Sequence, residues 1–156
     1  MKKKKVIITG AAGFVGLNLI NLINAKKYNL IAIDKNKNNL KFTKEIKPEV
    51  SLINANLAEI KETWAKYFNG ADCVIQLQAQ ISSPNKEDYI VNNIKTVKNV
   101  LKVCKKYRVK NLIHVSTTGV ISAARDNYST TKTIGEKIVI ESKVPHTILR
   151  PSMIYG

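Results

Sequence analysis

The glycine-rich turn near the N-terminus constrains the fold more than any other feature of the sequence. The segment TGAAGFVG, residues 9–16, follows the apolar run VIIT and leads directly into the apolar segment LNLINLI. Gly10 allows a tight turn, Gly13 lets backbone N–H groups approach a pyrophosphate, and Gly16 lets a helix pack closely on a sheet. A strand, this turn and a helix therefore predict a dinucleotide site. Because no Gly-Lys-Ser/Thr follows, a mononucleotide P-loop is excluded.

The rest of the chain alternates between short apolar runs and longer helix-periodic segments, a pattern typical of a parallel sheet with right-handed crossovers. The predicted strands are residues 5–9, 30–34, 50–54, 73–77, 111–116 and 147–150, and the predicted helices are residues 13–25, 38–44, 58–68, 86–107 and 129–142. We expect one α/β domain over residues 1–156, a doubly wound parallel sheet of the Rossmann type in three αβα layers.

Asp34 ends the second predicted strand, where a carboxylate accepts hydrogen bonds from the adenosine ribose hydroxyls. A carboxylate there also repels a 2′-phosphate, so NAD is favoured over NADP as the cofactor. Lys35 and Lys37 follow immediately and weaken this preference. The alternative is structural: the glycines only shape a turn and Asp34 only caps the next segment.

The net charge of +15 raises the possibility of nucleic-acid binding. The lysines are scattered along the chain without interleaved aromatic residues, which favours a solvated basic surface over a nucleic-acid partner. No apolar run approaches the ~18 residues of a membrane span, and the opening MKKKK lacks the apolar core of a signal peptide. We therefore expect a cytoplasmic protein with no membrane partner.

Cysteines and histidines give no sign of a metal site. Cys73 and Cys104 lie in separate apolar segments and are expected to be buried free thiols. His114 and His146 lack clustered partners, so no metal is predicted.

A second group of polar residues supplies the chemistry for oxidation of a carbinol. Tyr128 and Lys132 are four residues apart and share one face of a predicted helix. Thr117, with Ser116 and Thr118, follows a predicted strand at the edge where open α/β sheets bind ligands. We expect the Lys132 ammonium to lower the pKa of the Tyr128 hydroxyl so that it exchanges protons, while a threonine hydroxyl holds the substrate oxygen.

Six segments together resemble the extended short-chain dehydrogenase/reductases, the family of NAD-dependent sugar epimerases and dehydratases, over essentially the whole chain. They are VIITGAAGFVG, VIQLQAQ, VNNIKTVKNVLKVC, VKNLIHVSTTGVIS, YSTTKTIGEK and TILRPSMIYG. The resemblance implies that Thr117 is the catalytic hydroxyl, with Thr118 as the alternative, and that Tyr128 is the acid/base. Lys132 would lower the pKa of Tyr128 and bind the nicotinamide ribose.

The resemblance also implies a set of cofactor contacts. Asn92 would support the active-site lysine, and Arg150, Pro151 and Ser152 would flank the nicotinamide. The full set of predicted cofactor-binding residues is Gly10, Ala12, Gly13, Phe14, Val15, Gly16, Asp34, Lys35, Asn56, Leu57, Leu77, Gln78, Ala79, Asn92, Val115, Tyr128 and Lys132.

Several residues depart from the family's motifs and restrict the reactions that we expect. Gln76 and Gln78 stand where the family usually has His and Ala, which puts ribose contacts there in doubt. Thr118 and Gly119 stand where the dehydratases have two acidic residues, so dehydration is disfavoured. The loop after Thr117 is short. The family's C-terminal substrate subdomain is absent, and we expect a truncated form rather than a naturally short version that relies on a partner.

The predicted function is that of an NAD-dependent epimerase or oxidoreductase that transfers a hydride reversibly at a carbinol carbon of a small molecule, a nucleotide sugar. Two alternatives remain open: a carbonyl reductase that uses NAD or NADP, and a non-catalytic dinucleotide sensor. The resemblance further implies a homodimer that pairs the helix at 129–142 and the long helix before it with a second copy.

Overall fold

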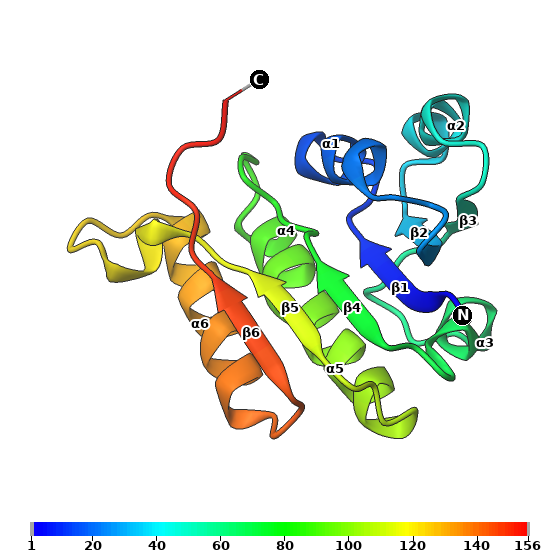
Figure 1. Ribbon diagram of the computed structural model, residues 1–156. Helices are drawn as coiled ribbons and strands as arrows, with labels where there is room; N and C mark the ends of the chain where they lie inside the picture. Colours follow the sequence, from blue (N-terminus) through cyan, green and yellow to red (C-terminus); the bar gives the residue numbers. More distant parts are fainter. Residues whose placement is uncertain (1, 156) are drawn as a thin grey trace.

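Six parallel strands form the sheet that the apolar runs predict (Figure 1). The computed structural model describes residues 2–155. The strands are β1 (Lys4–Thr9), β2 (Tyr28–Asp34), β3 (Ser51–Asn54), β4 (Cys73–Gln76), β5 (Leu112–Val115) and β6 (His146–Leu149). Their order in the sheet is β3-β2-β1-β4-β5-β6. Strands β2 and β3 are therefore added on one side of β1 and strands β4 to β6 on the other, so the strand order reverses between β1 and β4. This is the strand order of a doubly wound dinucleotide-binding sheet.

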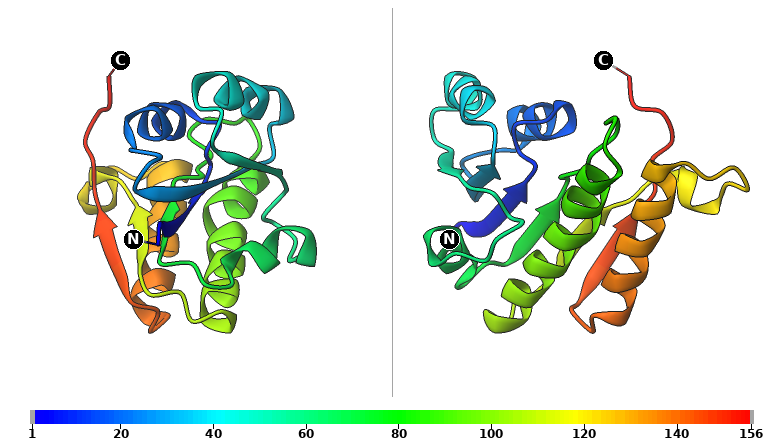
Figure 2. Two further views of the ribbon diagram at one scale, coloured as in Figure 1. Left: turned by 45° about the vertical axis from the view of Figure 1, so that its right-hand side comes forward. Right: turned by 180° about the vertical axis from the view of Figure 1, so that it is seen from behind.

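Helices cover both faces of the sheet (Figure 2). They are α1 (Phe14–Leu22), α2 (Lys37–Ile46), α3 (Glu62–Ala65), α4 (Lys86–Ile90), α5 (Thr96–Lys106) and α6 (Asn127–Glu141), with 3₁₀ turns η1 (Lys66–Phe68) and η3 (Thr118–Ile121) and a π-helical segment η2 (Val91–Lys95). The segments α4, η2 and α5 run on without a break, as the predicted helix at 86–107 requires.

Two apolar clusters fill the space between the layers, because successive strand residues point to opposite faces. Ile7 packs in the cluster under α5 and α6, which also holds Trp64 and Phe68. Its neighbour Ile8 packs in the cluster under α1 and α2, with Ile20 and Leu40. The three-layer arrangement expected from the sequence is therefore present.

Two predicted helices are shorter in the structure than expected. The helix predicted at 13–25 ends at Leu22. The helix predicted at 58–68 is a single turn, Glu62–Ala65, followed by η1. Before that turn, local contacts compete with helix formation: the Asn56 carboxamide accepts from the Ala58 N–H, and the Trp64 indole donates to the Glu59 carbonyl.

Helix α6 begins two residues before its predicted start because of a capping box. The Asp126 carboxylate accepts from the Ser129 N–H at 2.6 Å, and the Ser129 hydroxyl accepts from the Asp126 N–H at 3.0 Å. This start places Tyr128 in the first turn of the helix.

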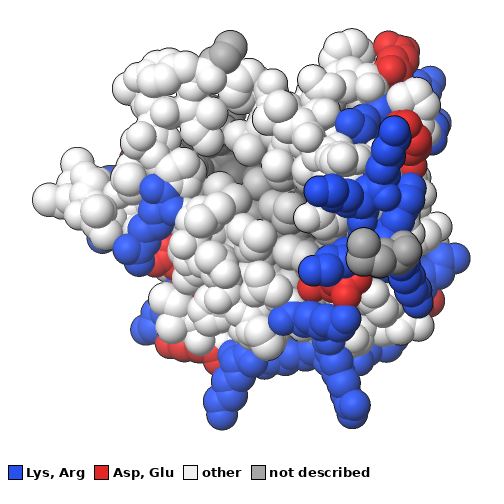
Figure 3. Space-filling view, in the orientation of Figure 1, with Lys and Arg blue, Asp and Glu red and all other residues white. Residues whose placement is uncertain are grey.

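Within residues 2–155, no helix combines the length and the apolar character needed to cross a membrane. Both cysteines are free thiols, Cys104 buried and Cys73 partly buried. No group of three metal-ligating side chains is found among the same residues. In Figure 3, Lys and Arg side chains spread over the lower and right-hand parts of the molecule, and the upper left, above the ends of β5 and β6, carries few charges.

Candidate cofactor and active site

A cleft of about 570 Å³ opens at the carboxyl ends of the strands, on both sides of the point where the strand order reverses. Open α/β sheets bind their ligands at this place. The cleft is lined by the three predicted catalytic residues and by every member of the predicted cofactor-binding set except Ala12: Gly10, Gly13, Phe14, Val15, Gly16, Asp34, Lys35, Asn56, Leu57, Leu77, Gln78, Ala79, Asn92, Val115, Thr117, Tyr128 and Lys132. Ile81, Thr96, Met153 and Ile154 also line the cleft, although they were not predicted to contact the cofactor.

Two glycines of the turn are required by close packing. Gly10 has φ +70°, and a Cβ there would lie 2.4 Å from the Gln78 backbone nitrogen. A Cβ at Gly16 would lie 2.5 Å from the Ala11 carbonyl oxygen, so this glycine brings α1 onto the strand exit. Both positions therefore exclude any side chain.

Gly13 has a different role, because its surroundings have room for a Cβ. Its φ is −81°, and a Cβ would come no nearer than 3.4 Å to the Gly10 carbonyl oxygen. Gly13 caps α1 without a side chain, and the first N–H groups of a helix have no carbonyl partner within it. The first turn of α1 also contains no acidic residue. These features fit a pyrophosphate group, which helix N-termini attract.

The Asp34 carboxylate lies against the glycine turn. One oxygen accepts from the Ala12 N–H at 3.1 Å and the other from the Asn36 N–H at 2.9 Å. Ala12, the remaining predicted residue, is buried and contacts this carboxylate. The geometry fixes Asp34 at the edge of the cleft, and its contact with a ribose stays a prediction.

The predicted effect of Lys132 on the pKa of Tyr128 stays a prediction, because the Lys132 ammonium contacts another group in this structure. Burial raises the pKa of the Tyr128 hydroxyl above its usual value, the side-chain hydrogen bond with Thr117 opposes the shift, and the charge of Asp126 adds to it. The Lys132 ammonium instead donates to the Val115 carbonyl oxygen at 2.6 Å. The Tyr128 hydroxyl is therefore protonated at neutral pH and can donate a proton.

Lys132 is a buried cation at the base of the cleft, with 3% of its surface exposed. Burial lowers the pKa of its ammonium to about 8, and the nearby charge of Glu136 partly opposes this shift. A cation that titrates near neutral pH inside a cleft marks a functional-site candidate.

Asn92 does not support Lys132 as the resemblance implied. Its hydrogen bonds go to Lys35, Gln80 and Asp88. The buried carboxamide at this point is Asn93, which accepts from the Gln80 N–H at 2.7 Å and donates to the Thr131 hydroxyl at 3.0 Å. Asn93 thus ties the exit of β4 to α6. The sequence gives two adjacent asparagines, and only the π-helical turn decides which one points inward.

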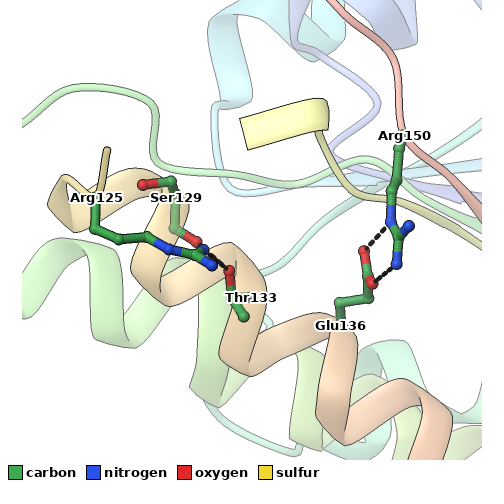
Figure 4. Close-up of polar contacts among 5 residues, drawn as sticks. All are labelled: Arg125, Ser129, Thr133, Glu136 and Arg150. Carbon is green, nitrogen blue, oxygen red and sulfur yellow. Dashed lines mark hydrogen bonds and ion pairs between the residues drawn. The ribbon is translucent and has the colours of Figure 1, made fainter. Parts of the chain in front are cut away.

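Arg150 also differs from its prediction, because it pairs with Glu136 of α6 (Figure 4). Its Nε donates to Glu136 Oε2 at 3.1 Å, and its Nη2 contacts Oε1. The guanidinium lowers the pKa of the Glu136 carboxyl. Pro151 and Ser152, its neighbours, line the cleft, and their contact with a nicotinamide stays a prediction. Figure 4 also shows Arg125 donating to the Thr133 hydroxyl at 2.7 Å.

A group of polar side chains lies at and beneath the floor of the cleft, on β1, β4, β5 and the residues that follow β4. His114 Nδ1 and Gln76 Oε1 are 2.9 Å apart, and the Gln78 carboxamide oxygen accepts from the Thr9 hydroxyl at 2.5 Å. Burial lowers the pKa of His114 to about 3, so this imidazole is neutral. The two glutamines that depart from the family pattern are therefore built into this group.

Comparison with known proteins decides the family. The sequence profile of the NAD-dependent epimerase/dehydratase family matches residues 6–156. The chain belongs to this family. The match confirms the extended short-chain dehydrogenase/reductase assignment and NAD as the family's cofactor.

The chain is also similar in sequence or structure to individual known proteins. The chain is 28% identical to the uncharacterized UDP-glucose epimerase YtcB of Bacillus subtilis, covering 97% of this chain and 57% of that protein. It is 28% identical to short-chain dehydrogenase/reductase family 42E member 1 of Macaca fascicularis, covering 99% of this chain and 47% of that protein. A solved structure of UDP-glucuronic acid 4-epimerase from Bacillus cereus in complex with NAD superposes with a TM-score of 0.84 at 24% identity, over 97% of this chain and 57% of that chain. The chain therefore spans about half the length of the relatives it matches.

Proposed function

We propose that the chain binds NAD in the cleft and forms the cofactor-binding part of an enzyme that acts on a nucleotide sugar. One observation carries this proposal: the glycine turn, Asp34 and the group Thr117, Tyr128 and Lys132 surround a single cleft. The glycine turn and Asp34 fit a dinucleotide, and the three polar side chains fit proton exchange with a substrate hydroxyl.

Each polar residue has a separate task in this proposal. The N-terminus of α1 holds the pyrophosphate, and Asp34 accepts from the adenosine ribose. The Tyr128 hydroxyl exchanges a proton with the substrate hydroxyl, Thr117 orients that oxygen, and Lys132 stabilises the phenolate once the cleft is filled. NAD bound here would supply a hydride acceptor at the carbinol carbon, and an epimerase would return the hydride to the opposite face.

The proposed substrate class follows from the relatives. A UDP-glucose epimerase and a UDP-glucuronic acid 4-epimerase are among the matching proteins, which supports a UDP-hexose as the first candidate. Thr118 and Gly119 follow Thr117 without a carboxylate, so water elimination lacks an acid at this point.

A carbonyl reductase is the second candidate function. It would use the same residues, because a protonated tyrosine can donate to the oxygen of a ketone. The relative of the short-chain dehydrogenase/reductase 42E type also supports this alternative.

The proposed function is tested by incubating the enzyme that contains this chain with NAD and UDP-glucose. Sugar composition is followed by chromatography and reduced cofactor by absorbance. An epimerase forms UDP-galactose without net reduced cofactor, whereas an oxidoreductase that releases its product accumulates it. Tyr128→Phe should abolish either activity and leave NAD affinity within about twofold, since the ring is retained. Turnover by Tyr128→Phe would exclude the role given to this residue.

We also propose that the protein is a cytoplasmic homodimer that pairs α4–α5 and α6 with a second copy. Ile134 and Ile140 of α6 are 42% and 55% exposed and supply apolar contacts for such a pairing. Sedimentation of the wild type and of Ile134→Lys tests it. A wild-type monomer at micromolar concentration would contradict the pairing.

A further inference from the structure

Lys35 and Asn92 are joined across one end of the cleft. The Lys35 ammonium donates to the Asn92 Oδ1 at 2.9 Å. Lys35 directly follows β2, and Asn92 lies in η2, so the bond connects two separate walls. Both residues line the cleft, next to Asp34.

The direction of the Asn92 carboxamide is set by its other hydrogen bonds. Its nitrogen donates to the Asp88 carbonyl at 2.9 Å and to the Gln80 Oε1 at 3.1 Å. Gln80 is itself oriented, because its own nitrogen donates to the Ser82 carbonyl at 2.6 Å. Since both acceptors are oxygens, the Asn92 nitrogen must face them, and its Oδ1 is left facing Lys35.

The Lys35 ammonium is thus held away from its neighbour Asp34. Among residues 2–155, no ion pair joins the two, and the Asp34 carboxylate accepts from backbone N–H groups instead. A basic side chain beside this acid is what accommodates a ribose 2′-phosphate, whereas the acid alone prefers a 2′-hydroxyl. The position of one ammonium therefore bears on the choice of dinucleotide.

We propose that Asn92 is a specificity-determining residue: it holds Lys35 across the cleft, so that Asp34 alone governs the ribose 2′ position and NAD is preferred over NADP. This inference rests on the proposed function as a dinucleotide-binding chain. Because Lys35 is exposed, its single hydrogen bond is a modest restraint. Its release should change NADP affinity by roughly five- to tenfold.

The test measures the dissociation constants of NAD and NADP by calorimetry for four variants and the wild type. Asn92→Leu removes the acceptor and should raise the affinity for NADP relative to that for NAD roughly fivefold. Asn92→Asp loses the same two donated hydrogen bonds but keeps an acceptor for Lys35, so it should retain the preference for NAD. Lys35→Gln and the double variant Asn92→Leu/Lys35→Gln should show no gain for NADP.

Three results would overturn the inference: no gain in Asn92→Leu, an equal gain in Asn92→Asp, or a gain that survives in the double variant. A wild type that binds neither dinucleotide would refute the proposed function instead, so the two failures are distinguishable. Circular dichroism melting of each variant verifies that the fold is retained.

Discussion

Lys132 shows how a single residue can work against stability at a candidate active site. Its ammonium is buried and donates to the Val115 carbonyl, and burial lowers its pKa from 10.5 to about 8. The folded state therefore holds this charge at a cost. Strained or desolvated groups of this kind are common at functional sites.

Lys132→Met should stabilise the fold, because methionine fills similar space without a buried charge. We expect the free energy of unfolding at pH 7 to rise by about 1–3 kcal/mol, the lost hydrogen bond offsetting part of the gain. Between pH 8 and 10.5 the unfolded chain binds a proton that folded Lys132 does not, so the wild type gains stability as pH rises through this window.

Urea unfolding of both proteins at pH 7 and pH 10 measures this difference. The advantage of the methionine variant should shrink at the higher pH. A variant that is less stable than the wild type at pH 7 would contradict the desolvation argument.

The pair of Glu136 and Arg150 should respond asymmetrically to substitution. The Glu136 side chain is 7% exposed and that of Arg150 is 44% exposed. Arg150→Gln leaves the buried Glu136 carboxylate without its partner and should lower Tm by roughly 5 °C. Glu136→Gln leaves a half-exposed guanidinium without its partner and should lower Tm less. Since the pKa of Glu136 is lowered, the stabilisation is present at neutral pH and is lost as pH falls.

Thermal melts followed by circular dichroism give the order of the two variants. Glu141→Gln, which removes an exposed i,i+4 partner of Lys137, is the matched control with little expected change. Equal effects of the two central substitutions would contradict the burial argument.

At the residue scale, spacing predicted the glycines and the acid because backbone geometry demands them. The close contacts at Gly10 and Gly16 are those that a strand-to-helix turn requires. The contacts of Asn92 and Arg150 differ from those that the resemblance implied, since they depend on which way a side chain leaves a π turn or a strand end. The spacing of residues along the sequence does not show in which direction a side chain points.

At the scale of elements, the contact between η2 and α6 brings the two halves of the site together. A Cβ at Gly135 would lie 2.7 Å from the Asn93 carbonyl oxygen, so α6 touches the backbone of the π-helical turn. The same turn directs the Asn93 side chain to Gln80 and Thr131. π-helical turns inside longer helices often occur at functional sites, and here one sets the distance between α6 and the exit of β4.

Gly135→Ala should therefore destabilise the fold by about 1–3 kcal/mol, although alanine favours helix formation. Gly119→Ala is the matched control, because its Cβ would meet only ordinary contacts at 3.5 Å. Denaturant unfolding of both variants measures the difference. A Gly135→Ala protein as stable as the wild type would show that α6 moves away from η2 at no cost.

Helices with a clear periodicity of apolar residues were predicted well. Segments whose structure depends on local polar contacts were not. The long helix 86–107 carries a wide apolar face and was predicted within one residue at its end. The helix predicted at 58–68 has apolar residues too, but contacts of Asn56 and Trp64 with nearby backbone groups reduce it to one turn. Such contacts do not alter the hydrophobic pattern.

For the whole molecule, the strand order places the candidate site. Alternating strands and helices predict a parallel sheet, and the reversal between β1 and β4 opens the cleft between the glycine turn and the exit of β4. The second half of the sheet then brings Thr117, Tyr128 and Lys132 to the same edge.

The affinity of the Gly13→Asp variant for NAD tests the central claim most directly. Asp is a favoured N-cap residue and Gly13 has a φ of −81° with room for a Cβ around it, so the variant should fold with an unchanged or higher Tm. The new carboxylate would occupy the pyrophosphate cradle. We predict that calorimetry shows one NAD bound per wild-type chain and at least a tenfold loss of affinity in Gly13→Asp. A wild type that does not bind NAD, or a folded variant that binds it as tightly, would contradict the account.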